Sequence, residues 1–376
     1  MRVALTKSSL LIPPTYFAVA HAQKMRSDFD FRFFTMAAEI RDSGISVPIE
    51  DFVPFRDKPF ASRERFLPLV MPAMSRSIRR FDPFVIHQHF ATWSWPAVRA
   101  ARAGHAPLIT TLHGSDVVMA ESQANTAMAK WHHHNINLVQ KHSSKILAVS
   151  EYLASQAIRN GFSSRKIAVH YQGIDTDVFR PLDPMQESSG NSSSRPIVLF
   201  VGALNDQKGI LHLARASTDL FRYIEHDLVV VGQGVHQEEL RHMSQTHPHI
   251  KMLGQLSRAE VLKQLQTATL LVAPSRLHNG AREAAGLVLL EAQASGTPVV
   301  AYRSGGTPEM VGPDSGRLVT EDDVEGLGNS IRSILELDSA SYSAMKISAR
   351  EYVLSQRSLR RSVEELSEHY LEVGKS

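Results

Sequence analysis

The sequence predicts an α/β protein built from two doubly wound domains, each with a parallel sheet covered by helices. Short apolar runs alternate with helix-length connections along the whole chain, which is typical of parallel strands joined by crossover helices. The 376 residues exceed what one ordinary hydrophobic core accommodates, so two domains are expected. The stretch PLDPMQESSGNSSSR at 181–195 interrupts the alternation with Pro, Ser, Gly and Asn, which indicates a linker.

The apolar runs locate the individual strands. In the first half, the predicted strands are 3–5, 29–34, 84–87, 108–112, 146–149 and 167–170. In the second half, they are 197–201, 228–231, 250–253, 270–272 and 298–301. The predicted organisation is an N-terminal domain over 1–180, a linker over 181–195, a C-terminal domain over 196–350 and a final amphipathic helix within 351–376.

The composition is ordinary for a soluble globular protein. Hydrophobic residues make up 43% of the chain and charged residues 21%, and no apolar run reaches the length of a membrane-spanning helix. Pro13 and Pro14 break the apolar patch near the N-terminus, so we assign 2–6 to a first strand rather than to a signal peptide. The absence of cysteine excludes disulfides and Cys-ligated metals and fits a cytoplasmic location.

The net charge of +3 conceals an uneven distribution. Residues 1–180 carry 22 Lys and Arg against 14 Asp and Glu, whereas the remaining residues carry 19 against 24. Arg and Lys alternate with Phe, Leu, Val and Met over 56–81, and we interpret this segment as a docking surface for an anionic membrane. A solvated helix rim and a grip on a phosphorylated soluble acceptor are the alternatives. No nucleic acid partner is assigned.

One stretch, 269–302, carries the pattern of a ligand site. It predicts a buried strand, a polar loop, a short helix from about Gly286 to Gly296 and a second buried strand. The free N–H groups of Gly286, Leu287 and Val288 at the helix start would face a nucleotide diphosphate.

Three charged side chains surround this helix start. Glu291, one turn into the helix, is predicted to accept hydrogen bonds from a ribose diol, and Glu283 in the loop is predicted to face the group attached to the distal phosphate. Lys208, in the loop 202–209 after the first strand of the C-terminal domain, is predicted to clamp the phosphates from the same sheet edge. A solvated lysine and an ordinary strand–loop–helix unit with two unrelated glutamates are the alternatives.

These residues belong to a series of short motifs in a fixed order. The series comprises DPFVIHQH at 82–89, TLHGSD at 111–116, AVSE at 148–151, GID at 173–175, FVGALNDQKG at 200–209, EAAGLVLLE at 283–291 and GGTPE at 305–309. In this order the chain resembles the retaining glycosyltransferases of family 4, which include bacterial polysaccharide, lipopolysaccharide and mannosyl transferases. The resemblance implies the GT-B fold, in which two Rossmann-like domains face a central cleft and the last helix returns to the N-terminal domain.

The resemblance also implies an activity and roles for residues. His113 would contact the donor sugar, Glu283 would hold its hydroxyls, and main-chain groups near Leu256 would hold the nucleobase. The donor would be a UDP- or GDP-sugar, used without a metal or other cofactor, with Lys208 and the helix terminus stabilising the leaving diphosphate. A hexosyl group would pass with retention to a glycan or lipid-linked acceptor of the cell surface, at the inner face of the cytoplasmic membrane.

The chain departs from the family pattern in two places. Ala203 stands where many relatives carry Arg, so Arg276, Arg282 or Arg303 would have to supply that cation. The N-terminal glycine pair of the family is replaced by LIPPTY at 11–16. Two alternative functions stay open: a nucleotide-sugar epimerase of the same architecture, and a non-catalytic nucleotide-sugar-binding protein.

Two histidines share one predicted strand. His87 and His89 lie two residues apart, and we assign them to opposite faces of the strand. That assignment argues against a metal ion held by both.

Overall fold

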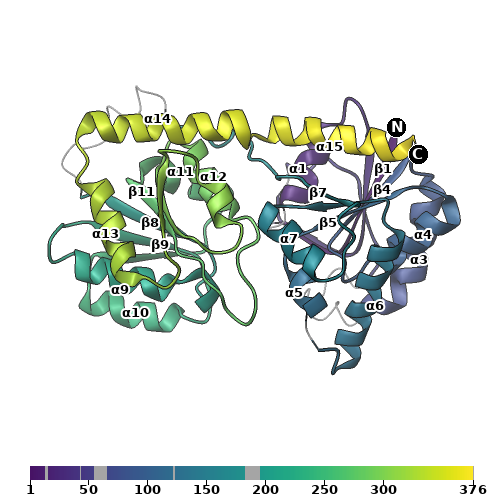
Figure 1. Ribbon diagram of the computed structural model, residues 1–376, viewed down its shortest axis with the longest axis horizontal. Coiled ribbons are helices and arrows are strands. Elements are labelled where there is room, and N and C mark those ends of the chain that lie inside the picture. The colour runs from purple at the N-terminus through teal and green to yellow at the C-terminus, as the bar shows by residue number, and fades with distance from the viewer. Residues whose placement is uncertain (13–15, 43, 55–65, 122, 183–194, 376) are drawn as a thin grey trace. The chain divides into compact units, whose positions relative to one another are not determined.

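The computed structural model describes residues 1–12, 16–42, 44–54, 66–121, 123–182 and 195–375 (Figure 1). They form two compact units, Met1–Gln172 with Arg360–Ser376, and Gly173–Leu359. Most of the predicted linker at 181–195 lies outside the described residues. Each unit contains one sheet with helices around it, which confirms the predicted α/β fold class.

The first unit contains a seven-stranded sheet with the order β3-β2-β1-β4-β5-β6-β7, and all neighbouring strands run parallel. The strands are β1 (Arg2–Ile12), β2 (Asp30–Ile40), β3 (Ile49–Asp51), β4 (Val85–His89), β5 (Leu108–Leu112), β6 (Lys145–Ala148) and β7 (Ile167–Val169). The helices are α1 (Tyr16–Lys24), α3 (Leu67–Phe81), α4 (Trp95–Gly104), α5 (Ser115–Glu121), α6 (Ala127–His142), α7 (Glu151–Arg159) and α15 (Leu359–Gly374). Every residue of β4 and β5 is buried, as expected for a parallel sheet covered on both faces.

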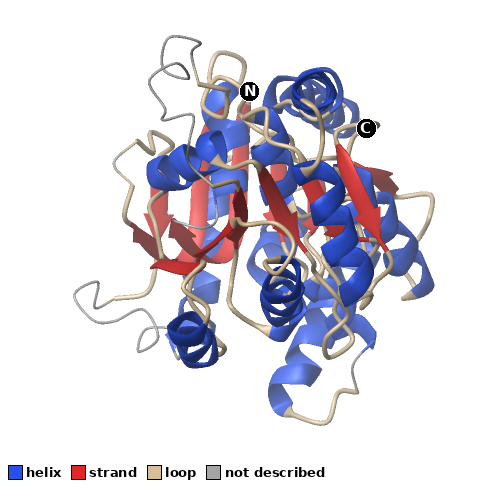
Figure 2. Cartoon of the chain, turned by 90° about the vertical axis from the view of Figure 1, so that its left-hand side faces the viewer, coloured by secondary structure: helices blue, strands red, loops and turns tan. Residues whose placement is uncertain are grey.

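The second unit contains a six-stranded parallel sheet with the order β10-β9-β8-β11-β12-β13. Figure 2 shows strands of this sheet lying between helices. The strands are β8 (Ile197–Val201), β9 (Asp227–Val231), β10 (Ile250–Gly254), β11 (Leu270–Ala273), β12 (Val299–Tyr302) and β13 (Gly316–Val319). The helices are α9 (Ile210–Leu220), α10 (Gln237–Thr246), α11 (Arg258–Thr267), α12 (Leu287–Ala294), α13 (Val324–Leu335) and α14 (Ser339–Gln356), with 3-10 turns η2 (Asp206–Lys208) and η3 (Thr307–Met310).

Two observed strands were not predicted. Two of the three residues of β3 are acidic, and β13 begins with a glycine, so neither has the apolar run on which the prediction rested. Each is formed by pairing with one neighbour, β3 with β2 and β13 with β12. Tertiary pairing therefore outweighs the weak local preference of these segments.

The C-terminal helix α15 packs on the sheet of the first unit. Leu366, Tyr370 and Val373 are buried in one apolar cluster with Val3 and Leu5 of β1. One face of the amphipathic helix thereby covers the sheet, while its ion pairs of four-residue spacing lie on the exposed face. None of the helices in the described ranges combines the length and the apolar content needed to cross a bilayer.

Candidate functional site

The candidate site lies at the carboxyl edge of the six-stranded sheet, where the loops after β8, β11 and β12 meet. Gly209 has φ 66°, and a Cβ atom there would lie 2.0 Å from the carbonyl oxygen of Pro274. Gly305 has φ 59°, and a Cβ atom there would lie 2.2 Å from the carbonyl oxygen of Glu283. Only glycine allows these backbones to approach so closely at positive φ, so the two glycines hold the loops together.

Lys208 and Glu283 form an ion pair at this edge. Lys208 ends the η2 turn, where the side chain of Asn205 accepts a hydrogen bond from the Lys208 N–H at 3.0 Å. The Lys208 ammonium donates to the Glu283 carboxylate, and the Ser275 hydroxyl donates to the same carboxylate at 3.4 Å. The two charged side chains are 30% and 17% exposed, so a ligand can reach them from solvent.

Glu283 is held in its charged form. Burial raises the pKa of this carboxyl, but the charge of Lys208 and hydrogen bonds from Lys208, Ser275 and the Gly286 N–H outweigh burial. The pKa therefore lies below its ordinary value. Glu283 is an anionic acceptor suited to hydroxyl groups, and an entering phosphate would share the ammonium of Lys208 with it.

Helix α12 begins directly beside this ion pair. Its N-cap residue, Gly286, has φ 67° and ψ 52°, and the Gly286 N–H donates to Glu283. That amide is therefore engaged rather than free, contrary to the prediction. The N–H groups of Leu287 and Val288 have no acceptor within the described part of the chain. These two amides and the positive end of the helix dipole remain available to an anion.

Glu291 lies one turn into α12 and is half-buried. Burial raises the pKa of its carboxyl to about 7, while the positive charge of Arg258 opposes the rise. Among the described residues, none donates a hydrogen bond to this carboxylate. Glu291 is therefore close to half-ionised at neutral pH, with both oxygens available to a ligand.

Leu256 lies at the end of β10, in the short connection to α11. The next residue, Ser257, is the N-cap of α11 and forms a capping box with Glu260, which fixes the connection. Within the described ranges, neither the N–H nor the carbonyl of Leu256 takes part in a hydrogen bond. Its main-chain donor and acceptor are therefore available at the same edge of the sheet.

His113 follows β5 at the carboxyl edge of the sheet in the first unit. The buried carboxylate of Asp116 accepts hydrogen bonds from the N–H groups of His113 at 3.2 Å and Gly114 at 3.0 Å. Burial raises the pKa of Asp116 to about 6, and the hydrogen bonds from the backbone limit that rise. Asp116 thus holds the turn that presents His113.

The imidazole of His113 is held by contacts on its faces and at both nitrogens. Its Nε2 lies 3.1 Å from Nδ1 of His89 and its Nδ1 lies 3.4 Å from Nε2 of Gln172. The ring of Phe90 stacks on it with centroids 4.3 Å apart. Burial, reinforced by the positive charge of Lys7, holds the pKa of His113 well below its ordinary value. His113 is therefore a neutral hydrogen-bonding group at physiological pH.

Two family descriptions match the chain. Residues 22–178 match Glycosyltransferase Family 4, and residues 183–352 match Glycosyl transferases group 1. The first match contains His113, and the second contains the ion pair of Lys208 and Glu283. The chain is a family 4-type glycosyltransferase.

Named relatives and solved structures agree with this assignment. The glycosyltransferase is 27% identical over 264 residues to a GDP-mannose-dependent monoacylated alpha-(1-6)-phosphatidylinositol monomannoside mannosyltransferase of Corynebacterium glutamicum, covering 68% of this chain and 67% of the relative. It is 25% identical over 349 residues to the sulfoquinovosyl transferase SQD2 of Arabidopsis thaliana, covering 87% of this chain and 66% of the relative. The matches thus span about two thirds of the length of these relatives.

The fold of the glycosyltransferase recurs in a crystal structure of Anabaena HepE in complex with UDP and glucose. The TM-score is 0.77 at 19% identity, and the match covers 99% of this chain and 100% of the other. At this identity the likeness concerns the fold alone. It confirms the predicted GT-B architecture of two Rossmann-like units.

Three arginines are candidates to replace the cation missing at Ala203 of the glycosyltransferase. Arg276 pairs with Asp322, and Arg282 pairs with Glu321 at 3.1 Å. Arg303 is exposed at the end of β12, and no carboxylate among the described residues pairs with its side chain. Arg303 is therefore the arginine of the three whose charge is not already balanced.

The assignment of His87 and His89 to opposite faces was wrong. Residues two apart in a strand point to the same face, and their ring centroids lie 4.5 Å apart. His87 bonds Tyr370 of α15 and Thr111 of β5, each at 2.7 Å. The buried histidines of the glycosyltransferase thus connect the C-terminal helix to His113.

Sequence reasoning missed this row of histidines. The signal that could have found it is the alternation of polar residues at positions 87, 89 and 111 inside apolar strands. Among the described residues of the glycosyltransferase, no group of three or more His, Asp or Glu side chains is arranged to hold a metal ion.

Proposed function

We propose that this glycosyltransferase binds the diphosphate of a nucleotide sugar between Lys208 and the first turn of α12, and transfers the sugar to a glycan or lipid-linked acceptor. The observation that carries the proposal is the Lys208–Glu283 ion pair beside the available amides of Leu287 and Val288. An ammonium group and helix amides together supply the charge and the donors that a diphosphate requires. The relative named as GDP-mannose-dependent and the UDP-bound structure support this class of donor.

The surrounding residues take the remaining parts of the donor. Glu291 accepts hydrogen bonds from the ribose diol, and the main chain at Leu256 holds the nucleobase. Glu283 faces the sugar hydroxyls as an anionic acceptor. His113 contacts the donor sugar as a neutral imidazole, a role that stays a prediction from the family resemblance.

The transfer retains the configuration of the anomeric carbon. The bond from this carbon to the diphosphate oxygen breaks, and the acceptor hydroxyl forms the new bond on the same face. The proton of that hydroxyl passes to the departing phosphate oxygen. Lys208 and the amides of Leu287 and Val288 stabilise the negative charge that develops on the diphosphate. The Lys208–Glu283 pair is suited to this task because the ammonium is already positioned before the ligand arrives.

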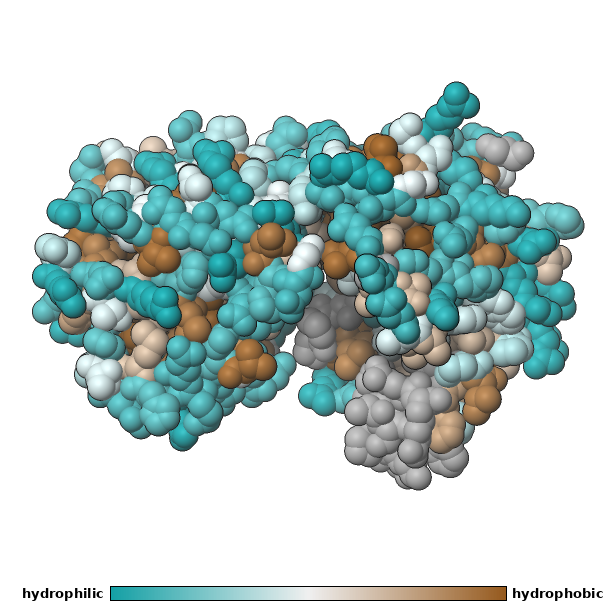
Figure 3. All heavy atoms as spheres, turned by 60° about the horizontal axis from the view of Figure 1, so that its bottom comes forward, coloured by the Kyte–Doolittle hydropathy of each residue, from teal (hydrophilic) through white to brown (hydrophobic). Residues whose placement is uncertain are grey.

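The acceptor is proposed to lie at the inner face of the cytoplasmic membrane. The relative from Corynebacterium glutamicum is named for a phosphatidylinositol-linked acceptor, which supports a lipid-linked class. Arg76, Arg79 and Arg80 lie exposed on α3, whereas the other basic residues of 56–81 lie outside the described residues. On the face shown in Figure 3, hydrophobic residues form small separate groups among hydrophilic ones. On α3 itself, Leu69 is exposed in the same helix as these arginines, so charge and an apolar side chain would both contribute to docking.

Neither alternative from the sequence is retained. The matched families and the named relatives are glycosyltransferases, so an epimerase has no support. The same matches make a purely non-catalytic binding protein the weaker explanation.

A thermal-shift screen with UDP-, GDP- and ADP-sugars tests the donor site. A donor at about one hundred times its Kd should add roughly 2.7 kcal/mol to stability. The Lys208→Ala variant should lose most of this effect, because it removes the ammonium that faces the diphosphate. Lys263→Ala is the matched control, since Lys263 is exposed on α11. Equal stabilisation of both variants, or no donor that stabilises the parent protein, would overturn the assignment.

Co-sedimentation with vesicles tests the membrane location. The parent protein should bind vesicles that contain anionic lipid at low salt and be released at high salt, because exposed charges are screened. Arg76→Glu/Arg80→Glu should weaken binding, as each cation near the surface contributes about 1 kcal/mol. A parent protein that stays in the supernatant at low salt would contradict docking through α3.

A further inference from the structure

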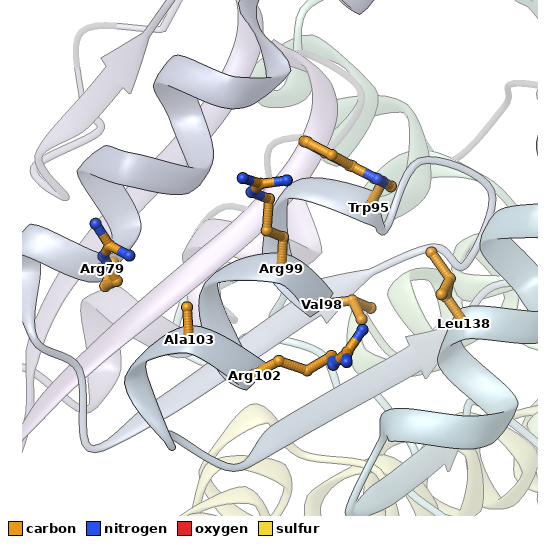
Figure 4. A pocket seen from close by; sticks show the side chains of 7 residues that line it. All are labelled: Arg79, Trp95, Val98, Arg99, Arg102, Ala103 and Leu138. Atoms are coloured by element: carbon orange, nitrogen blue, oxygen red, sulfur yellow. The ribbon is translucent and has the colours of Figure 1, made fainter.

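We propose that a pocket on the helical face of the first unit binds a phosphate group, separately from the nucleotide-sugar donor. The pocket lies among α3, α4 and α6 and has a volume of about 400 Å³. Figure 4 shows guanidinium groups from two neighbouring helices around it. Its lining residues are Arg79, Trp95, Val98, Arg99, Arg102, Ala103 and Leu138.

The pocket concentrates positive charge that is not balanced nearby. Within the described part of the chain, no carboxylate forms an ion pair with Arg79, Arg99 or Arg102. Asp82, just beyond the end of α3, pairs instead with Arg2. The three arginines are exposed, and together they give the pocket a positive potential that favours an anion with more than one negative charge.

The geometry suits a phosphate better than a single carboxylate. Each guanidinium presents a planar fork of donors that matches two phosphate oxygens, a pairing that a carboxylate makes only once. The stem of Arg79 is packed against the end of α4, because its Cγ atom would lie 3.6 Å from a Cβ atom at Gly104. Arg99 is held over the ring of Trp95 at 5.2 Å. The guanidinium of Arg99 is thus positioned before a ligand arrives, and the stem of Arg79 lies close to the end of α4.

The apolar side chains that line the pocket indicate which group the phosphate of the ligand carries. Trp95, Val98 and Leu138 line the pocket with apolar surface, and the volume exceeds what a bare phosphate fills. The ligand class is therefore a phosphate ester with a small organic part, such as the glycerol phosphate of a soluble metabolite or of a phospholipid headgroup.

Stabilisation of the helices does not account for the cluster. Arg79 and Arg102 lie in the last turns of α3 and α4, where cations favour the helix dipole. Arg99 lies one turn earlier, on the same pocket, where the dipole offers little. The helix dipole therefore accounts for Arg79 and Arg102 but not for Arg99, whose contact with Trp95 instead keeps its charge beside the pocket.

The test uses the full-length protein with two probes that share one chemistry. Glycerol 3-phosphate is titrated by calorimetry, and vesicles of phosphatidylglycerol in phosphatidylcholine are tested by co-sedimentation. The pocket variant is Arg99→Gln/Arg102→Gln, and the charge-matched control is Arg159→Gln/Arg165→Gln, whose arginines are exposed elsewhere in the first unit. Lys208→Ala separates this site from the donor site.

At least one probe should bind the parent protein, and the pocket variant should bind it about ten-fold or more weakly, because charge-assisted hydrogen bonds are lost. The control and Lys208→Ala should bind as the parent does. Binding of glycerol 3-phosphate assigns a soluble ester, and vesicle binding that the pocket variant loses while the control keeps it, without binding of glycerol 3-phosphate, assigns a lipid headgroup. The proposal is overturned if neither probe binds, or if the pocket variant and the control lose binding equally. Failure of donor binding in Lys208→Ala would leave this result unaffected.

Discussion

At the scale of single residues, the chemistry of the glycosyltransferase depends on how burial and pairing alter the pKa values of two glutamates. Glu291 has a pKa raised to about 7 by burial, whereas Glu283, also shielded, has a lowered pKa because Lys208 lies against it. Two glutamates eight residues apart thus differ in charge at neutral pH. This difference suits Glu283 to act as a permanent anion and Glu291 to ionise when a ligand binds.

Glu291 makes nucleotide affinity depend on pH. If the ionised carboxylate accepts both ribose hydroxyls, affinity for UDP or GDP rises as the pH increases through 7, since the ionised fraction grows. Glu291→Gln should weaken binding by about ten-fold or more, from the loss of a charge-assisted hydrogen bond, and should remove the part of the pH dependence that belongs to the protein. Calorimetric titrations at pH 6, 7 and 8 would measure both effects. A parent and a variant with parallel pH profiles would exclude this role for Glu291.

Glu283 should affect turnover more than nucleotide binding. Glu283→Gln removes the anion that faces the sugar and releases the ammonium of Lys208 to the diphosphate. We expect affinity for plain UDP or GDP to stay within a few-fold of the parent value, and turnover to fall by about ten- to one-hundred-fold. Initial rates with the donor found by screening, measured beside calorimetry with the free nucleotide, would separate the two. A large loss of plain nucleotide affinity would contradict the placement of Glu283 beside the sugar.

At the scale of elements, the candidate site exists because loops from different strands touch. The loop after β8 reaches the loop after β11 at Gly209, and the Arg276 N–H donates to the Gln207 carbonyl at 2.8 Å between the same loops. Lys208 is fixed by this contact, since it precedes Gly209 directly.

Gly209→Ala should therefore damage both stability and the donor site. Gly280 is the matched control, because its φ of 77° is also positive but a Cβ atom there meets nothing within 4 Å. Gly280→Ala should incur only the cost of a left-handed conformation, about 1 kcal/mol. Gly209→Ala should lower the free energy of unfolding by more than Gly280→Ala does. It should also reduce nucleotide affinity, because the loop that holds Lys208 must move. Thermal unfolding with and without nucleotide would compare them, and equal effects of the two variants would exclude the steric argument.

The attachment of α15 can be tested at its buried hydroxyl. Tyr370 is fully buried and its hydroxyl lies 2.7 Å from Nδ1 of His87. Tyr370→Phe leaves that nitrogen without its partner, at a cost of about 1 to 3 kcal/mol. Tyr223→Phe is the control, since Tyr223 is 74% exposed. Chemical denaturation would measure both free energies of unfolding, and indistinguishable values would show that the hydroxyl contributes nothing to the packing of α15.

At the scale of the whole molecule, the buried histidines make the first unit sensitive to acid. Burial lowers the pKa of His21 to about 3 and that of His369 to about 4, and the pKa values of His87, His89 and His170 are also lowered by burial. The unfolded chain binds more protons than the folded one between these values and about 6.5. The stabilisation that comes from keeping these histidines neutral is therefore fully present above about pH 6.5. The free energy of unfolding falls as the pH drops below this value.

Each of these histidines contributes a slope of about 1.4 kcal/mol per pH unit in that window. Asp116 has the opposite effect on stability, because burial raises its pKa to about 6 and the folded chain therefore takes up this proton more readily than the unfolded chain. The effect of this one group is smaller than the summed effect of the histidines. Hydrogen exchange at pH 7.0, 6.0 and 5.0, corrected for intrinsic rates, should show peptides of the first unit losing protection before those of the second. Protection in the first unit that stays constant to pH 5 would contradict the assignment of neutral, buried histidines.

Much of the fold was predictable from the chain because its cause is local. Buried parallel strands require apolar runs on both faces, so runs such as 108–112 and 197–201 were visible in the sequence and are β5 and β8 in the structure. The short strands β3 and β13 were not visible, because pairing with a neighbour rather than apolar content creates them. The family was likewise indicated by the order of the motifs along the chain.

The sequence by itself determined the two-sheet α/β architecture and the identity of the charged residues near the helix start. Only the tertiary structure decided which groups meet. Lys208 forms an ion pair with Glu283, which lies 75 residues away in the sequence, and His87 forms a hydrogen bond with Tyr370, which lies 283 residues away. The physical reason is that hydrogen bonding and the pKa of a group depend on burial and on neighbours within a few ångströms. Packing of distant segments sets both, as it does for the three arginines that α3 and α4 bring to one pocket.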